Sequence, residues 1–326
     1  VFIDLRDRSG VLQLVFHPEQ GAAHELAGRL SPEDVICAAG PVVARDAETG
    51  NPRIATGPVA LAAADLEGLS EADPLRVPVE DETVDISEEV RLTYRYLDIR
   101  RAARLRALEL RSAITRAIRG VLDEADYMEV ETPVLTRSTP EGARDFLVPS
   151  RLQPGSWYAL PQSPQLFKQL LMVAGLERYY QIVRCFRDED LRADRQPEFT
   201  QVDIEASFVS PDQVMELVER ILAAVFDASG FDIAIPFPRM GYAEAMRRFG
   251  SDRPDLRYGL EIVDYSEHAA ASEFAVFRTT VEGGGVVRGL VVPGAGAGMS
   301  RKDGDDLVDE ATGFGAKGLV WAIVEE

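Results

Sequence analysis

Apolar and polar residues alternate with a period of two over the first part of the chain, which predicts a β-rich unit at residues 1–66. Strand-length runs of this kind lie at residues 1–7, 11–16, 33–45 and 57–66. The first two flank a turn at residues 8–10, so we expect them to pair as a hairpin. A short helix is predicted over about residues 21–30. Small five-stranded barrels built from such strands bind oligonucleotides on one face by stacking and edge hydrogen bonds.

The pattern becomes helical after an acidic, proline-containing stretch at residues 67–87, which has no period and is predicted to be a linker or hinge. Ser87 followed by two glutamates is typical of a helix start. A serine can cap the first backbone N–H groups, and acids favour the positive end of the helix dipole. Arginine-rich helices are therefore predicted over residues 88–98 and 101–125.

The most informative pattern lies at residues 181–207, where two apolar strands enclose a highly charged loop. The apolar positions are Ile182, Val183, Phe186, Phe199, Val202 and Ile204. Arginine binds phosphate oxygens through its planar fork, and a carboxylate can accept a hydrogen bond from a base amino group. The hairpin therefore suits a polyanion that carries a base, although a solvated hairpin tip would have a similar mixture of charges.

Further elements follow from the same periodicities. A strand is predicted over residues 127–135, a loop over 136–150, a helix at the end of 160–173, an amphipathic helix over 211–226, and a strand-rich region with glycine turns from about 270 to the end.

Composition describes an ordinary globular chain with two or three domains: 326 residues, of which 46% are apolar and 28% are charged. The net charge of −20 by itself argues against nucleic-acid binding. Residues 91–119, however, carry nine arginines and only two acids. This region can bind RNA locally, or it can line a helix with solvated and ion-paired groups.

The chain shows no sign of an oxidising or membrane environment. Its two cysteines and three scattered histidines form neither a disulfide framework nor a metal-binding cluster, which fits a reducing cytoplasm. It has no run of about 18 apolar residues and no signal peptide, so neither a membrane span nor export is expected. Val1 already lies inside a predicted strand, which indicates a piece of a longer protein.

The charged hairpin, in the string FRDEDLRADRQPEFTQVD, resembles motif 2 of the class II aminoacyl-tRNA synthetases, and specifically that of the bacterial-type aspartyl enzymes. The resemblance implies an α+β fold with a partial class II antiparallel-sheet catalytic core at residues 88–269. A partial OB-fold β-barrel for anticodon binding (residues 1–66) and a linker (67–87) would precede it. A partial α/β insertion domain of the GAD type (270–326) would follow it.

The resemblance also implies a reaction, in which ATP activates L-aspartate to aspartyl-adenylate and the aspartyl group passes to tRNA-Asp. Arg187 would hold the α-phosphate of ATP and act as the catalytic residue. Glu189 would read the adenine amino group and Phe199 would stack on the base. Asp188 and Gln196 would belong to the same ATP site.

The aspartate site implied by the resemblance comprises Glu141, Ser163, Gln165, Lys168, Arg187 and Asp203. Ser163, Gln165 and Asp203 would lie near the substrate ammonium group. Lys168 would pair with the side-chain carboxylate of aspartate, and a neutral amide in its place would leave the lysine charge unpaired. A structural salt bridge between Lys168 and an acid of the pocket is the alternative.

Contacts with tRNA and with a second subunit are also implied. Phe2 would stack on an anticodon base and Gln13 would read a base edge, while Arg192 and Arg195 would meet the acceptor end. Phe2 could instead be a core residue, because a strand phenylalanine usually points inward. Pro133, in a segment that resembles motif 1, would lie at a homodimer interface, since a proline cannot donate to a ladder and belongs at an edge.

Residues 294–301 imitate the glycine spacing of class II motif 3, which ends in an arginine. We expect a turn, because glycine spacing alone is weak evidence and acidic residues follow Arg301. The motif 3 arginine and the ligands of the Mg²⁺ that accompanies ATP are then expected beyond residue 326, and the chain alone is expected to be inactive. Two alternatives stay open: an enzyme that also charges tRNA-Asn, and a truncated form that only binds tRNA or dimerises.

Overall fold

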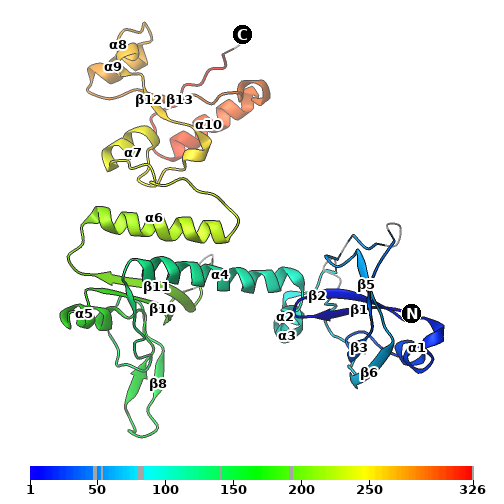
Figure 1. The fold of residues 1–326 in the computed structure, drawn as a ribbon. Coiled ribbons are helices and arrows are strands. Elements are labelled where there is room, and N and C mark those ends of the chain that lie inside the picture. The colour runs from blue at the N-terminus through cyan, green and yellow to red at the C-terminus, as the bar shows by residue number, and fades with distance from the viewer. Residues whose placement is uncertain (47–49, 53, 80–83, 140, 191–193, 325–326) are drawn as a thin grey trace. The chain divides into compact units, whose positions relative to one another are not determined.

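The computed structural model describes the chain except residues 47–49, 53, 80–83, 140, 191–193 and 325–326. Contacts divide the chain into two compact units (Figure 1). The first comprises Val1–Phe208 and Ala224–Phe231, and the second comprises Val209–Ala223 and Asp232–Glu326. No helix among the described residues is long and apolar enough to cross a membrane.

The N-terminal strands form where they were predicted, except that the runs at 33–45 and 57–66 are each divided between two strands and the last strand extends over residues 67–70 of the predicted linker. They are β1 (Phe2–Asp7), β2 (Gly10–Val15), β3 (Val35–Ala39), β4 (Val42–Ala44), β5 (Val59–Ala62) and β6 (Asp65–Ser70). Four of them form a sheet in the order β1-β2-β5-β4, and β3 pairs with β6. The strands β1 and β2 form the expected antiparallel hairpin. The predicted helix is also present, as the short 3₁₀ turn η1 (Pro18–Gln20) followed by α1 (Ala22–Ala27).

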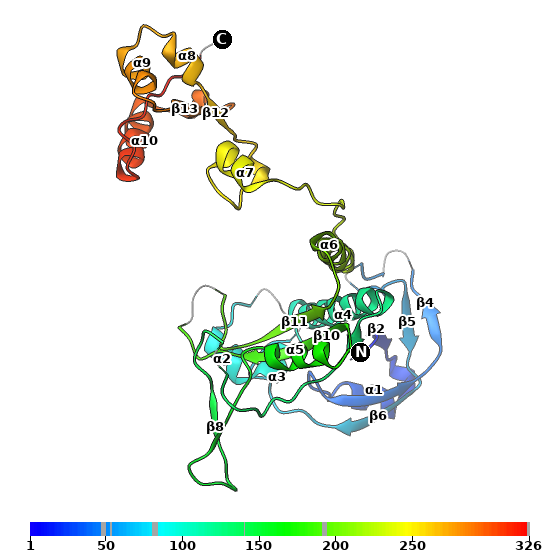
Figure 2. The same cartoon turned by 90° about the vertical axis from the view of Figure 1, so that its left-hand side faces the viewer.

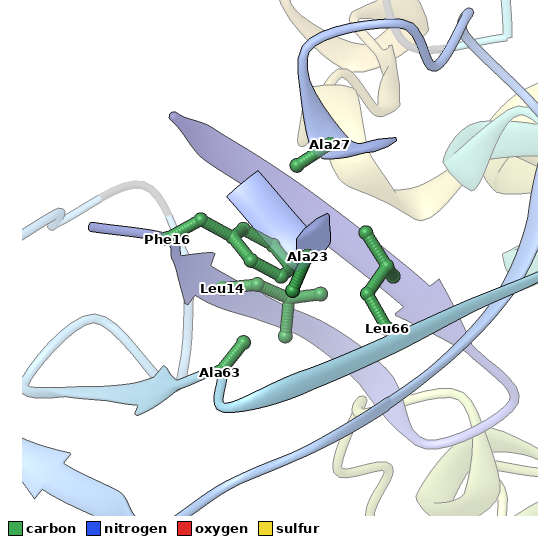
Figure 3. Packing of buried hydrophobic residues seen from close by; sticks show 6 residues of the cluster. All are labelled: Leu14, Phe16, Ala23, Ala27, Ala63 and Leu66. Carbon is green, nitrogen blue, oxygen red and sulfur yellow. The ribbon is translucent and has the colours of Figure 1, made fainter. Parts of the chain in front are cut away.

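Small side chains allow α1 to lie close to these strands. Ala23 and Ala27 are buried in one hydrophobic cluster with Leu14 and Phe16, as Figure 3 shows. Burying a Leu or Phe side chain stabilises a fold by roughly 1.5–3 kcal/mol, so this cluster is a substantial local core. Its remaining buried members are Ala63 and Leu66.

Helices follow the stretch predicted to be a linker. They are α2 (Glu88–Thr93), α3 (Arg95–Asp98) and α4 (Ala102–Glu124). The Ser87 hydroxyl accepts a hydrogen bond from the Val90 N–H at 3.4 Å, so the predicted cap is confirmed. The single helix expected at 88–98 is broken at Tyr94, whose backbone is not helical. In the stretch itself, Val77 and Val79 are buried, so this part is packed against the protein.

The central sheet has the order β11-β10-β7, built from β7 (Met128–Glu129), β10 (Arg178–Phe186) and β11 (Glu198–Ala206). β10 and β11 are antiparallel, as predicted, and β7 is parallel to β10. The strand expected over 127–135 is therefore mostly wrong. Only two residues pair, and the left-handed backbone of Asp126 (φ 59°) turns the chain just before them. The hairpin of β8 (Leu147–Pro149) and β9 (Trp157–Ala159) and the predicted helix α5 (Gln165–Val173) complete this region.

Alternation along β10 and β11 separates the two faces of this sheet, because successive strand side chains point in opposite directions. Even-numbered residues face α4: Tyr180 donates to Asp123 at 2.8 Å, and Arg111 donates to Thr200 at 2.8 Å. Odd-numbered residues face α5, where Lys168 contacts the carboxylate of Asp203. The two helices thus cover opposite faces of the β10–β11 pair (Figure 1 and Figure 2).

The second unit contains most of α6 (Pro211–Ala228), a predicted helix that is confirmed. Its other elements are α7 (Tyr242–Phe249), η2 (Leu256–Tyr258), β12 (Ile262–Asp264), α8 (Ser266–Ala270), α9 (Ala275–Glu282), β13 (Arg288–Leu290), η3 (Gly296–Gly298) and α10 (Arg301–Gly313). β12 and β13 pair in an antiparallel manner.

The expectation of a strand-rich region after residue 270 is largely wrong. The run predicted as its first strand is α9, and the described residues after α10 form no strand. In α9 the hydroxyls of Thr279 and Thr280 donate hydrogen bonds to the backbone carbonyls four residues earlier, each at 2.7 Å. The helix thus gives a hydrogen-bond partner to β-branched residues that usually favour strands. Phe274 and Phe277 pack edge to face at 4.9 Å, a contact that helical spacing permits.

Candidate active site

Arg187 and Phe199 come together at one end of the β10–β11 pair. The register places Cys185 opposite Phe199, and the Arg187 N–H continues the ladder by donating to the Pro197 carbonyl at 2.9 Å. The Arg187 guanidinium carbon lies 5.0 Å from the centre of the Phe199 ring, within cation–π range. Two residues separated by the charged loop thus form one preorganised unit on the odd-numbered face of the sheet.

The loop between β10 and β11 carries the other predicted ATP residues and the residues predicted to meet the acceptor end of tRNA. Glu189 and Arg195 are exposed, and their charged groups lie 3.9 Å apart, so they are close enough for a weak ion pair. Asp188 and Gln196 are also exposed. Arg192 lies outside the described residues.

Lys168 lies between two carboxylates on the same sheet face. Its Nζ is 2.9 Å from Asp203 Oδ1 and 3.3 Å from Glu205 Oε2, and the side chains of Lys168 and Asp203 are only 11% and 10% exposed. The second oxygen of Asp203 is buried without a hydrogen-bond partner. With one cation facing two carboxylates, the group has a net negative charge and can accept a further cation such as an ammonium group.

Burial and charge act together on these groups. Burial raises the pKa of Asp203 above its ordinary value, and Glu205 and Glu141 act in the same direction against the opposing effect of Lys168. For Lys168, burial alone would lower the pKa, but hydrogen bonds and charge from Asp203 and Glu205 more than offset it and raise the pKa. The lysine therefore stays charged, whereas the acids compete for it.

Glu141 joins this site from the loop that precedes β8. Its carboxylate accepts from the Ser163 hydroxyl at 2.7 Å and from the Thr139 hydroxyl at 3.0 Å. Both Glu141 and Ser163 line a pocket of about 360 Å³ beside α5. The other lining residues are Pro133, Leu135, Thr136, Arg137, Thr139, Pro161, Leu166, Phe167 and Leu170. Gln165, the first residue of α5, is half-buried, and neither it nor Lys168 or Asp203 is among the residues that line this pocket.

Two residues of this site were missed in the sequence. Glu205 shares Lys168 with Asp203, and its position two residues later on the same strand is a signal that could have found it. Gln162 is 1% exposed and bonds to the backbone of Ala143 and the carboxylate of Asp145. No pattern in the sequence indicates that burial, because glutamine is usually exposed.

The predicted tRNA residues of the N-terminal sheet lie together on its outer face. Phe2 pairs with Val15, and Gln13 pairs with Asp4, so Phe2 and Gln13 are diagonal neighbours on one face of the hairpin. Phe2 is 71% exposed and is therefore not a core residue. The side-chain Nε2 of Gln13 donates to Asp4 at 3.1 Å, while its side-chain Oε1 is buried without a hydrogen-bond partner.

Arg301 differs from a motif 3 arginine in its surroundings. The glycines before it form turns and the short η3 segment, as expected, but the sequence did not predict that α10 would follow. Ser300 caps this helix by accepting from the Asp303 N–H, and Asp303 in return accepts from the Ser300 N–H. An aspartate of the helix itself thus lies at the end of α10 where an anion would otherwise bind.

The antiparallel β10–β11 pair, with an arginine stacked on a phenylalanine beside a lysine–carboxylate group, defines a class II synthetase core. Residues 87–304 match the family model of tRNA synthetases class II (D, K and N), and the chain belongs to this family.

Relatives of known name are similar over the whole chain. An aspartate–tRNA(Asp/Asn) ligase of Geobacillus sp. (strain WCH70) is 55% identical over 328 residues, which cover 100% of this chain and 55% of that protein. An aspartate–tRNA ligase of Geobacillus kaustophilus (strain HTA426) is 55% identical over 327 residues, with the same coverage. This chain therefore spans about half the length of the curated relatives it matches.

Solved structures support the fold. The asparaginyl-tRNA synthetase of Pyrococcus horikoshii with asparaginyl-adenylate has a TM-score of 0.60 at 24% identity, covering 70% of this chain and 50% of that one. The Entamoeba histolytica asparaginyl-tRNA synthetase with the same kind of ligand has a TM-score of 0.62 at 22% identity, covering 75% and 57%. At these identities the likeness shows the class II fold alone.

Proposed function

We propose that this chain is part of an aspartate–tRNA ligase, which activates L-aspartate with ATP and transfers it to tRNA-Asp. The observation that carries the proposal is the common sheet face on which Arg187 stacks on Phe199 and Lys168 lies between Asp203 and Glu205. The first pair suits a nucleotide and the second suits a charged amino acid. The 55% identity to aspartate–tRNA ligases supports the same assignment.

In the first step, an oxygen of the aspartate α-carboxylate attacks the α-phosphorus of ATP, and pyrophosphate leaves to give aspartyl-adenylate. Arg187 would neutralise the charge that develops on the phosphate, while Phe199 and Glu189 would hold the adenine. In the second step, a terminal hydroxyl of tRNA attacks the activated carbonyl carbon and AMP leaves. The protein supplies position and charge rather than a nucleophile.

Lys168 and its partners would recognise the amino acid. For Lys168 to bind the substrate side chain, Asp203 or Glu205 must yield part of its contact with the lysine. The released carboxylate, together with Glu141, would then accept the substrate ammonium group, aided by Ser163 and Gln165. The ion pairs seen here match the structural alternative for Lys168, and on this proposal they are the resting arrangement that the substrate replaces.

Class II tRNA synthetases use Mg²⁺ together with ATP. Among the described residues no three acidic, histidine or cysteine side chains gather as a potential metal centre. Asp203 and Glu205 already face Lys168, Glu189 faces Arg195, and Glu141 accepts hydrogen bonds from Ser163 and Thr139. We therefore assign no ion ligand in these residues, and no step above depends on one.

The domain roles are part of the proposal. Residues 1–66 would bind the anticodon as an OB-type domain, residues 67–87 would link it to the core, residues 88–269 would form the first part of the catalytic domain, and residues 270–326 would belong to a GAD-type insertion. Phe2, which is exposed, and Gln13, which is its half-buried neighbour on the same hairpin face, support the first role. Arg192 and Arg195 would meet the acceptor end, and Pro133 would lie at a homodimer interface.

The test is aspartate-dependent exchange of pyrophosphate into ATP by the protein that contains this chain. We expect exchange with aspartate and little with asparagine, and charging of tRNA-Asp. The absence of any aspartate-dependent exchange by folded protein would overturn the proposal. Charging of tRNA-Asn as well would identify the relaxed form, which the name of the Geobacillus sp. relative favours.

A further inference from the structure

Gln162 uses its whole side-chain amide to hold the loop that carries Glu141. Its Oε1 accepts from the Ala143 N–H at 3.0 Å, and its Nε2 donates to the Ala143 carbonyl at 2.9 Å and to an oxygen of Asp145. The other oxygen of Asp145 accepts from the Ser138 hydroxyl, which closes the loop on itself. The amide thus pairs with the loop backbone as a neighbouring strand would.

The next residue, Ser163, holds the same loop at a second point, since its hydroxyl donates to Glu141 at 2.7 Å. The loop also reaches the end of β10, where the Asp188 N–H donates to the Arg144 carbonyl at 3.0 Å. Ala143, which Gln162 holds, therefore lies in the chain between Glu141 and Arg144, whose carbonyl bonds to the residue that follows Arg187. A shift of the loop at Ala143 would move Glu141, which is two residues away in the chain.

A purely structural role would be the ordinary explanation for a buried glutamine, because buried amides are usually hydrogen-bonded. The partners of Gln162 argue for more, because all of them belong to one loop rather than to the sheet or to α5. Neighbouring loop residues Gly142 and Arg144 are exposed, so few apolar contacts hold this segment in place. Segments of this kind open locally at low free energy, and the bonds from Gln162 are then a large part of what closes them.

We propose that Gln162 is a positioning residue, which fixes the loop so that Glu141 keeps its place in the proposed amino-acid site. This rests on the proposed function insofar as aspartate binds at that site. The apparent affinity for the amino acid is proportional to the fraction of molecules whose loop is closed, so opening the loop weakens binding. Phe199 lies in β11 and Arg187 continues the ladder directly after β10, so the proposed ATP contacts are expected to change little.

Limited proteolysis tests the clamp without any substrate. Trypsin cleaves after Arg144, whose carbonyl is held by Asp188 in the closed loop. In the complete enzyme, we expect Gln162→Met, which keeps the length of the side chain but loses the amide, to be cleaved after Arg144 at least about tenfold faster. Each neutral hydrogen bond is worth roughly fivefold in an equilibrium. Gln169→Met, the same substitution at an exposed position on α5, is the matched control and is expected to behave as wild type.

A second pair of variants guards against misfolding of the methionine variant. Gln162→Glu places a carboxylate against Asp145 and is expected to release the loop at neutral pH. Adding Asp145→Asn restores a donor between the two side chains and is expected to slow cleavage again. Wild-type cleavage rates in both Gln162 single variants, or no rescue by the double variant, would overturn the clamp.

Pyrophosphate exchange by the complete enzyme tests the positioning role, because it gives KM for aspartate and KM for ATP separately. We expect Gln162→Met to raise KM for aspartate about tenfold or more, while KM for ATP stays within about twofold. An unchanged KM for aspartate in a variant whose loop is cleaved rapidly would refute the positioning role. A wild-type enzyme without aspartate-dependent exchange would refute the proposed function instead, and the clamp would then be judged by proteolysis alone.

Discussion

Replacing Lys168 by methionine is the sharpest test of the charge arrangement in the site. The variant keeps the length of the side chain but leaves Asp203 and Glu205 side by side without their cation. Removing one partner of a buried ion pair typically destabilises a protein by about 3–5 kcal/mol. Glu205 is partly exposed, so it can turn toward water, and most of the effect is expected at Asp203.

The loss of unfolding free energy in this variant has an upper limit, which depends on pH. Burial already raises the pKa of Asp203, and losing Lys168 raises it further. A carboxyl whose pKa is raised in the folded state stabilises the fold at low pH, and this contribution is lost as the pH rises through the folded pKa. Keeping such a group protonated at pH 7, against an ordinary pKa near 3.9, costs about 4 kcal/mol, and at pH 5 about 1.5 kcal/mol.

We therefore expect Lys168→Met to lose about 2–4 kcal/mol of unfolding free energy at pH 7 and about 1 kcal/mol at pH 5. Urea unfolding at several pH values between 4.5 and 8 measures the difference. Lys168→Arg, which keeps the charge, is the matched control. When Asp203→Asn removes the titrating group, the further loss caused by Lys168→Met is expected to vary little with pH.

A loss of stability that stays constant across this pH range would refute the reasoning, because it would show that packing rather than charge holds Lys168. The same variant separates recognition from collapse of the site. We expect aspartate binding to be lost far more than ATP binding. A comparable fall in both would show that the site had collapsed.

Three other predictions follow from single contacts. Arg187→Ala in the complete enzyme should lower pyrophosphate exchange by about 10²–10³ with the fold intact, and near-wild-type exchange would remove it from the mechanism. Burial raises the pKa of the Cys185 thiol to about 11, so at pH 8 an alkylating reagent should modify the exposed Cys37 and spare Cys185 until the protein unfolds, as peptide mass spectrometry would show. Gly40→Ala would place a methyl group 2.1 Å from a backbone oxygen of β5 and should lose about 1–3 kcal/mol in urea unfolding. Gly68→Ala, which meets nothing within 4 Å, should lose much less, and equal losses would contradict the clash.

Local sequence patterns predicted most of the elements that carry the site. The hairpin of β1 and β2, the β10–β11 pair and the cap at Ser87 were all expected, because turn residues and apolar periods act over a few neighbouring positions. Strand parity also follows from the sequence once β11 is known. It puts Phe199, Asp203 and Glu205 on one face before any contact is measured.

The same local signals failed where tertiary contacts decide the outcome. The β-branched run of α9 reads as a strand, but its threonines bond within the helix. The predicted strand after Tyr127 shrinks to β7, since pairing with β10 extends over only two residues. Propensity is a weak preference in each case, and the neighbours available to the segment override it.

The sequence by itself determined which chemical groups the protein has and roughly where they lie along the chain: the charged hairpin, the lysine of α5 and the glutamate of the loop. Only the tertiary structure decided which of them meet. Lys168 faces two acids that are 35 and 37 positions later in the chain, and Gln162 holds a loop about 20 residues earlier. Burial is the physical reason, because it depends on every element packed around a side chain, and it turns an ordinary carboxyl or amide into one whose charge and partners matter.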